Sequence, residues 1–265
     1  MNLPLLQRDL IRKPIVWLRV ASLGLLLGTA LLLLGQSRAA WELPIWMQIV
    51  VYGSLLSGMV GIMAQKWAKW LSVRMALASA TLLCLAVMGW WSRGFPWALV
   101  IEHTLFWTTP IWLWMAISGK NWTVGARVAT ALTFIGHGTY ALGFPFGVPD
   151  GFTEMTTRIL PISHAAALDF LFVAGVLDMV VALAILFPKA GKYALLYAAA
   201  WGLITAFARP VSYIEWSDWA GTTFRWSPEM LIRLTHGLTP LAIYLAEFYQ
   251  PETSVSQPQS TQGDF

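Results

Sequence analysis

Residues 166–187 read AALDFLFVAGVLDMVVALAILF, an apolar run that contains two acidic residues, Asp169 and Asp178. A helix needs about 20 residues to cross ~30 Å of hydrocarbon at ~1.5 Å per residue, and this run meets that length. The run is continuous and lacks the alternation of a half-buried strand. An open strand in lipid would also leave its backbone groups without hydrogen-bond partners. The stretch therefore predicts a transmembrane helix.

Seven further runs of the same type extend this prediction to the whole chain. Together they predict an all-α polytopic membrane protein with eight transmembrane helices, near residues 17–35, 45–64, 70–91, 97–117, 125–145, 166–187, 190–210 and 229–249. The composition agrees, since 57% of the residues are hydrophobic and 11% are charged, whereas a soluble domain has about 25% charged residues. This composition excludes a soluble enzyme and a nucleic-acid-binding protein.

The basic residues predict the orientation. Of the 17 Lys and Arg residues, eleven lie on the N-terminal tail and in the loops after the second, fourth and sixth runs, and five lie in the opposite loops. Loops rich in Lys and Arg stay in the cytoplasm, so we expect both termini there. The segment 250–265 is rich in Ser, Gln and Pro and is expected to be a disordered tail.

The first run also has an alternative interpretation as a signal peptide. Basic residues precede it, and Ser37-Arg38-Ala39 offers small residues at a cleavage site. The length of the apolar stretch from Val20 to Leu34 favours a membrane span instead. The single cysteine, Cys84, lies in a later apolar run and excludes an internal disulfide, a CxxC pair and a thiolate metal site.

The chain contains an internal repeat. RVASLGLLLGTALLLLG at 19–35 aligns without gaps to RVATALTFIGHGTYALG at 127–143, and Thr109-Pro110 corresponds to Thr239-Pro240. Each half then has four spans, an even number, so the two copies share one orientation in the membrane. We predict two parallel four-helix repeats, a scaffold-like one at 1–118 and one with a polar pocket at 119–249.

Matched positions differ in where they carry ionisable groups. His137 stands where the first half has Thr29, His236 stands where it has Phe106, and the position of Asp178 is uncharged in the first half. Ionisable side chains in a bilayer are costly and usually face a bundle interior or a watery cavity. The sequence therefore predicts a ligand pocket in the second half, with binding residues His137, Asp178, Arg209, Arg233 and His236.

Structural roles compete with this prediction. His137 between two glycines can hydrogen-bond a neighbouring helix, and Asp178 can fix helix register with Arg233 as its counter-ion. Glu102 and His103, in the outer third of the fourth span, either join the pocket or reach the headgroups. The pocket is expected to open outward, beneath a short amphipathic helix within 147–161 and the segment between the last two spans.

A quinone-type ring fits the predicted pocket, because its carbonyl groups accept hydrogen bonds and its chemistry moves protons. Two histidines are also the minimum for haem b, but the regular pairing of four histidines on two helices is missing. A zinc site lacks a third ligand at a suitable depth. Proton-coupled transport and a membrane scaffold without pocket chemistry remain alternatives to ligand binding, and no catalytic residue is assigned.

The phrases FLFVAGVLDMVVALAILFPK at 170–189 and LLYAAAWGLITAFARP at 195–210 resemble the DoxX-like group of small bacterial membrane proteins. The resemblance covers 125–249, and the first half follows through the repeat. It implies a multi-pass protein of the bacterial cytoplasmic membrane with a quinone-linked or redox accessory role. Its partners would be membrane lipids and other membrane redox subunits, with no nucleic acid. The lone Cys84 departs from a thiol-based mechanism.

Overall fold

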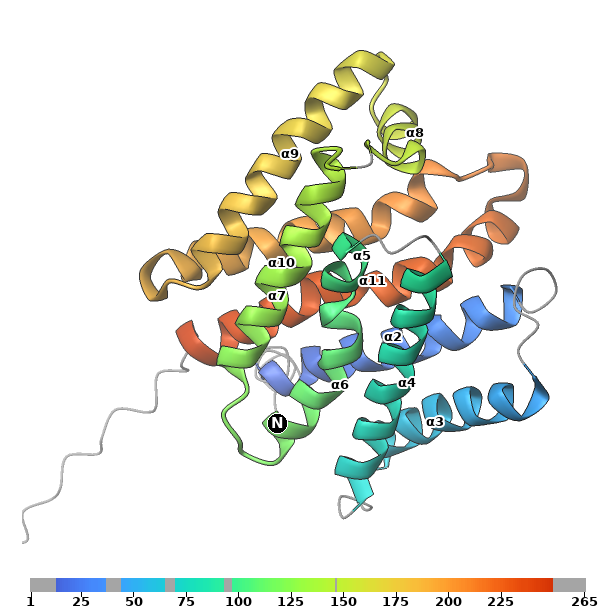
Figure 1. Cartoon of the computed structure of the whole chain (residues 1–265), viewed down its shortest axis with the longest axis vertical. Helices are drawn as coiled ribbons and strands as arrows, with labels where there is room; N and C mark the ends of the chain where they lie inside the picture. Colours follow the sequence, from blue (N-terminus) through green and yellow to red (C-terminus); the bar gives the residue numbers. More distant parts are fainter. Residues whose placement is uncertain (1–12, 37–43, 65–69, 93–96, 146, 250–265) are drawn as a thin grey trace, which may run out of the picture.

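The computed structural model describes residues 13–36, 44–64, 70–92, 97–145 and 147–249. These residues are mostly helical and contain no strand. Figure 1 shows the arrangement of the elements α2 (Pro14–Gln36), α3 (Ile45–Met63), α4 (Leu71–Ser92), α5 (Trp97–Glu102), α6 (Thr104–Ile117), α7 (Thr123–Ala141), α8 (Asp150–Ile159), α9 (His164–Ile185), α10 (Pro188–Ser212), η2 (Trp216–Asp218) and α11 (Trp219–Phe248). The expected tail at 250–265 and the cleavage-like stretch at 37–39 lie outside the described residues.

Five helices, α2, α3, α4, α9 and α10, are long and apolar enough to cross a membrane, which indicates a membrane-embedded protein. The sequence predicts eight spans. The remaining three predicted spans are helical, but each is either broken or less apolar than these five. The run at 97–117 is broken at His103 into α5 and α6, each too short to cross alone. Helices α7 and α11 are long enough, but polar and charged side chains lower their apolar character.

Local signals account for the helix ends around the longest apolar run. The Ser163 hydroxyl accepts a hydrogen bond from the Ala166 backbone N–H at 3.2 Å, which caps the start of α9. Pro188 is the first residue of α10, where its missing N–H has no cost. The hairpin from α9 to α10 therefore turns sharply at Phe187.

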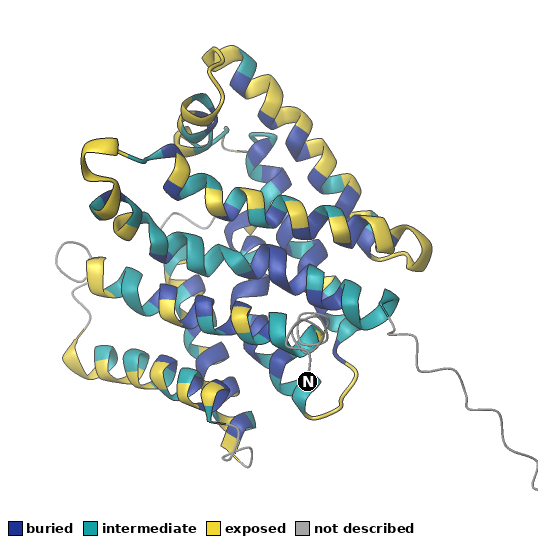
Figure 2. Ribbon diagram, turned by 180° about the vertical axis from the view of Figure 1, so that it is seen from behind, coloured by how far each residue is buried: buried dark blue, intermediate teal, exposed yellow. Residues whose placement is uncertain are grey.

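Helix α11 lies at the centre of the molecule and packs against α2, α6, α7 and α10 (Figure 1). The buried residues concentrate on these central helices, whereas α3 and α9 at the periphery expose long apolar faces (Figure 2). Apolar side chains such as Ile49 on α3 and Leu183 on α9 are more than half exposed. Such exposed apolar faces are suited to contact with lipid.

Small residues set the closest helix approaches, as expected for membrane helices. A Cβ added at Gly28 would lie 2.6 Å from the Pro228 carbonyl oxygen, and one at Gly58 would lie 2.9 Å from Leu26 Cδ1. Ser54 and Thr81 share a hydrogen bond of 2.7 Å between α3 and α4. Gly28 and Gly58 therefore lie at close helix interfaces.

Candidate functional site

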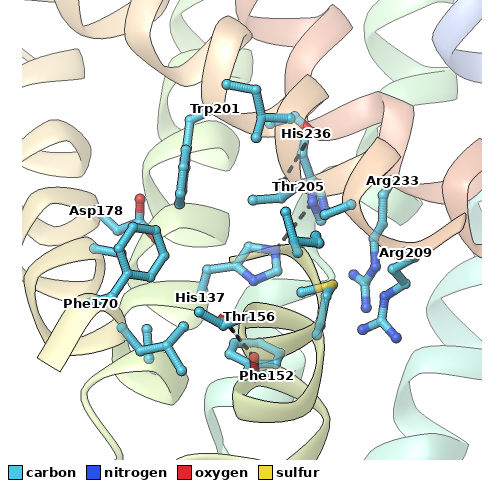
Figure 3. A pocket seen from close by; sticks show the side chains of 18 of the residues that line it. His137, Phe152, Thr156, Phe170, Asp178, Trp201, Thr205, Arg209, Arg233 and His236 are labelled. Carbon is cyan, nitrogen blue, oxygen red and sulfur yellow. Dashed lines mark hydrogen bonds between the residues drawn. The ribbon is translucent and has the colours of Figure 1, made fainter. Parts of the chain in front are cut away.

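His137 on α7 and His236 on α11 are in direct contact. His137 Nε2 lies 3.2 Å from His236 Nδ1, and the ring centroids are 4.8 Å apart in an edge-to-face arrangement (Figure 3). His236 also stacks on Phe106 of α6, with centroids 4.8 Å apart. The structure therefore brings together two residues that are 99 positions apart in the sequence.

Glu102 joins this pair from the first half of the chain. Its Oε1 lies 3.6 Å from His137 Nδ1 and 3.8 Å from Arg233 Nη1, and the residue is buried. Gly136 makes the approach of α5 to α7 possible, because a Cβ there would lie 2.6 Å from the Glu102 backbone nitrogen. We call Glu102, His137, Arg233 and His236 the polar cluster.

From the sequence, Glu102 either joins the pocket or reaches the headgroups, and the structure places it beside His137. Two features of the sequence point toward it. Glu102 is a carboxylate within an apolar run, and Gly136 lies one residue before His137 on the helix that Glu102 approaches. Their meeting depends on how α5 and α7 pack, which the sequence alone does not specify.

Asp178 lies apart from the polar cluster. It is buried on α9, and its Oδ1 has no hydrogen-bond partner among the described residues. Within that part of the chain Asp178 also forms no ion pair, whereas Arg233 lies beside Glu102. The proposed counter-ion role of Arg233 for Asp178 is therefore wrong, because helix packing directs Arg233 to a carboxylate of the other half.

Arg209 lies in the last turn of α10 beside Pro210 and forms an ion pair with Glu229 of α11, with Nη1 2.9 Å from Oε2. The pair holds the end of α10 against the N-terminal half of α11. Both groups are partly buried, so the attraction is screened less than at an open surface. Arg209 therefore has a structural partner in addition to its place beside the cavity described next.

A cavity of about 230 Å³ lies between α7, α8, α9, α10 and α11. All five predicted binding residues line it: His137, Asp178, Arg209, Arg233 and His236. The remaining wall is largely apolar and aromatic, including Phe170 and Trp201. In Figure 3, Asp178 lies on one side of this space, and the two arginines lie on the opposite side. The cavity thus has an apolar body with polar groups at two separated places. That these residues bind a ligand stays a prediction.

Helix α8 covers one side of the cavity. Phe152, Thr156 and other residues of α8 line the cavity, and α8 packs on α9 and α10. Glu154 accepts a hydrogen bond from the Tyr213 hydroxyl at 3.3 Å, and the Arg158 guanidinium lies 4.8 Å from the Tyr213 ring. Burial and the Glu154 carboxylate raise the pKa of Tyr213, so its hydroxyl remains a donor at neutral pH.

A second, larger cavity of about 940 Å³ lies on the other side of the polar cluster, between α2, α4, α5 and α11. Glu102, His103 and Phe106 line this space, together with leucines of α2 and α4. Arg209 and Arg233 line both cavities. The polar cluster is therefore the partition between the two cavities.

Comparisons with models of known families, with curated proteins and with solved structures find no match to this chain. Among the described residues, no group of three or more His, Cys, Asp or Glu side chains is arranged to hold a metal ion. The chemistry of the site is therefore inferred from its own geometry.

Proposed function

We propose that the chain crosses the membrane eight times, as two parallel four-helix repeats related by a pseudo-two-fold axis. Two contacts support this arrangement. Phe106 stacks on its matched residue His236 with an interplanar angle of 5°, and Thr109 Oγ1 lies 3.4 Å from Oγ1 of its matched residue Thr239. Residues that a two-fold axis interchanges meet each other only when they lie at the axis, so these pairs mark its course.

The glycines of the repeat support the same symmetry. A Cβ on Gly28 would meet the carbonyl oxygen of Pro228, and a Cβ on Gly136 would meet that of Ala98. Gly28 matches Gly136 in the aligned helices, and Pro228 matches Ala98 at the spacing of the Thr-Pro pairs. The first helix of each half thus packs against the fourth span of the other half at corresponding positions.

The packing of whole helices follows the same rule. With α2 matched to α7, α3 to α9, α4 to α10 and α6 to α11, the pairs α2–α3, α3–α4, α4–α6 and α2–α6 of the first half all recur in the second. Between the halves, α2–α11 corresponds to α7–α6. We therefore keep 1–118 and 119–249 as the two repeats, with both termini cytoplasmic on the strength of the basic loops.

We further propose that the 230 Å³ cavity binds a small lipophilic ring compound with oxygen acceptors, of the quinone class. The observation behind this proposal is the distribution of polarity in the cavity. The guanidinium groups of Arg209 and Arg233 can donate hydrogen bonds to a ligand oxygen at one side of the cavity. The apolar walls suit a hydrocarbon ring and an attached chain.

The size of the cavity agrees with a single substituted ring. An apolar protein cavity of about 150 Å³ binds benzene, and the space here is about 230 Å³. The position of α8 over the cavity would keep a bound ring out of water. The resemblance to DoxX-like proteins adds a redox accessory role in the bacterial cytoplasmic membrane, beside other membrane redox subunits.

The geometry disfavours a haem b held by His137 and His236. Axial imidazoles bind iron from opposite faces of the porphyrin, so at ~2 Å for each metal–nitrogen bond their ligating nitrogens lie about 4 Å apart. The nearest ring nitrogens of His137 and His236 are 3.2 Å apart and hydrogen-bonded to each other. No macrocycle fits between rings in this arrangement.

Ligand binding can be tested with decylubiquinone and the purified protein in lipid nanodiscs. Quinones quench indole fluorescence, and Trp201 lines the cavity. Ala174→Phe fills the cavity and should weaken binding about tenfold or more, since overpacking costs ~1–3 kcal/mol. Val173→Phe is the matched control, because Val173 is an exposed neighbour on the same helix. Equal affinities of the two variants, or no saturable quenching in the wild type, would overturn the proposal.

A further inference from the structure

Three neighbouring side chains, the buried Glu102 and His236 and the partly buried His137, form a row through the partition between the two cavities. Glu102 Oε1 lies 3.6 Å from His137 Nδ1, and His137 Nε2 lies 3.2 Å from His236 Nδ1. Both nitrogens of the His137 ring are therefore used, one toward each neighbour. His236 Nε2 is buried and has no hydrogen-bond partner in the described part of the chain.

The row joins spaces of different character. His137 and His236 line the smaller cavity proposed to bind a ring compound, whereas Glu102 lines the larger one. The larger cavity is also lined by the segment 147–152, which leads into α8 and includes Asp150. One end of the row thus adjoins the ligand cavity and the other adjoins a roomier, more polar space.

Several charged groups surround the row. Arg233 on α11 approaches the same Glu102 oxygen at 3.8 Å, and His103 follows Glu102 in the chain. Arg209 on α10 is paired with Glu229 on α11, and Asp178 faces the ligand cavity from α9. Arg233 has a carboxylate beside it and Arg209 has its own partner, so neither arginine interrupts the row.

We propose that Glu102, His137 and His236 form a proton relay between the ligand cavity and the larger cavity. This inference rests on the proposed ligand site and adds proton exchange to it. It also places the carboxylate of the relay in the first half of the chain. Asp178 lies apart from this row.

Each step of the relay conserves protons. The hydroquinone form of a quinone-class ligand carries a hydroxyl, which gives its proton to His236 Nε2 while His236 gives the proton on Nδ1 to His137 Nε2. His137 in turn gives the proton on Nδ1 to the Glu102 carboxylate. Each imidazole gains one proton and loses one, the ligand becomes an oxyanion near the arginines, and Glu102 becomes neutral. Imidazole suits both positions because one nitrogen donates while the other accepts.

The gap of 3.6 Å between Glu102 and His137 is longer than a hydrogen bond. A small side-chain rotation closes such a distance, and hydrogen bonds in a site often tighten when a ligand binds. The contact between the two histidines is already within hydrogen-bonding range. The relay therefore needs one local adjustment, at the Glu102 end.

A chromophoric phenol can report the position of the proton. We would bind para-nitrophenol to the full chain in nanodiscs, follow binding by Trp201 quenching, and follow phenolate by its visible absorbance below the pH of its ionisation in water. The wild type should show bound phenolate, whereas Glu102→Gln should bind the phenol without that absorbance. Glu102→Asp should restore part of the signal, and His137→Gln should abolish it because the row is cut.

The sign of the change separates a relay from plain electrostatics. If Glu102 acted only through its charge, its neutralisation would favour the phenolate, so an unchanged or stronger phenolate signal in Glu102→Gln would overturn the relay. Asp169→Asn serves as the control, because Asp169 is an exposed carboxylate on α9 outside the row. Loss of the signal in Asp178→Asn with retention in Glu102→Gln would assign the proton to Asp178 and would also overturn it.

If the wild type binds no phenol, the proposed ligand site is refuted but the relay is not. A second measurement then tests the relay by itself. The protein has four histidines, so isotope-labelled imidazole signals can be assigned individually. Glu102→Gln should shift the signals of both His137 and His236 and leave those of His164, exposed at the start of α9, unchanged. A shift confined to His137 would mean that no proton passes between the rings.

Discussion

The substitution Gly136→Ala tests how the polar cluster is assembled. The added Cβ would lie 2.6 Å from the Glu102 backbone nitrogen and 2.9 Å from the Ala98 carbonyl oxygen. Carbon atoms in ordinary contact are about 3.5–4.0 Å apart, so α5 must move away from α7 by about 1 Å. Because Glu102 lies at the contact, the same movement separates its carboxylate from His137.

The expected loss of stability follows from the type of obstacle. Both close atoms belong to the backbone, which cannot rotate away, so the cost should be that of overpacking, about 1–3 kcal/mol. Gly→Ala in a helix also brings a gain of about 0.5–1 kcal/mol from lower chain entropy. Gly53→Ala isolates this gain, because a Cβ at Gly53 meets nothing within 4 Å. The difference between the two variants should be about 1–3 kcal/mol.

Reversible unfolding in mixed micelles of dodecyl sulfate and dodecyl maltoside measures this difference. Gly28→Ala is the matched variant of the first half, since its Cβ would lie 2.6 Å from the Pro228 carbonyl oxygen. It should lose as much stability as Gly136→Ala, but it should keep the contact between Glu102 and His137. Equal stability of Gly136→Ala and Gly53→Ala would refute the close packing of α5 on α7.

Three further predictions concern topology, an ion pair and the outer cover. Reporter fusions at residues 120 and 190 should report the cytoplasm and fusions at 150 and 220 the outside, and an opposite result at any two sites would refute the eight-span arrangement. Glu247→Ala should cost about 3 kcal/mol in unfolding experiments because it leaves Arg127, which also donates to the Ile185 carbonyl at 2.6 Å, without its carboxylate. Glu154→Ala, by contrast, removes the exposed pair with Arg158 and should cost less than about 1 kcal/mol. Tyr213→Phe loses the hydrogen bond to Glu154, which contributes ~1 kcal/mol. The release of decylubiquinone, followed by stopped-flow quenching, should therefore become about fivefold faster. An unchanged release rate would mean that α8 does not hold the ligand.

Much of the helical structure could be predicted from the sequence. The apolar run at 166–187 largely overlaps α9, which spans His164–Ile185. Ser163 caps the start of α9, and Pro188 begins the next helix, α10. Short-range effects decide these features, namely the length of an apolar run, a capping hydroxyl and the missing N–H of proline. The short amphipathic helix expected within 147–161 is found at Asp150–Ile159.

The break in the fourth span could not be predicted from hydropathy. The run at 97–117 is apolar enough to suggest one helix, yet it is divided at His103 into α5 and α6. His103 Nδ1 lies 2.6 Å from the Leu99 carbonyl oxygen, and the Leu105 N–H donates to the Thr133 hydroxyl at 3.1 Å. The second of these contacts comes from α7, so the local backbone of the break depends on a neighbouring helix.

The sequence by itself determined which side chains are candidates, because an ionisable group in an apolar run is costly wherever the run packs. The tertiary structure decided which candidates meet. It placed Glu102 beside His137 and left Asp178 on the far side of the cavity. The physical reason is that the neighbours of a side chain in a helical bundle depend on the rotation and close approach of two helices. Those are determined by packing at residues such as Gly136, whose contacts come from the other half of the chain.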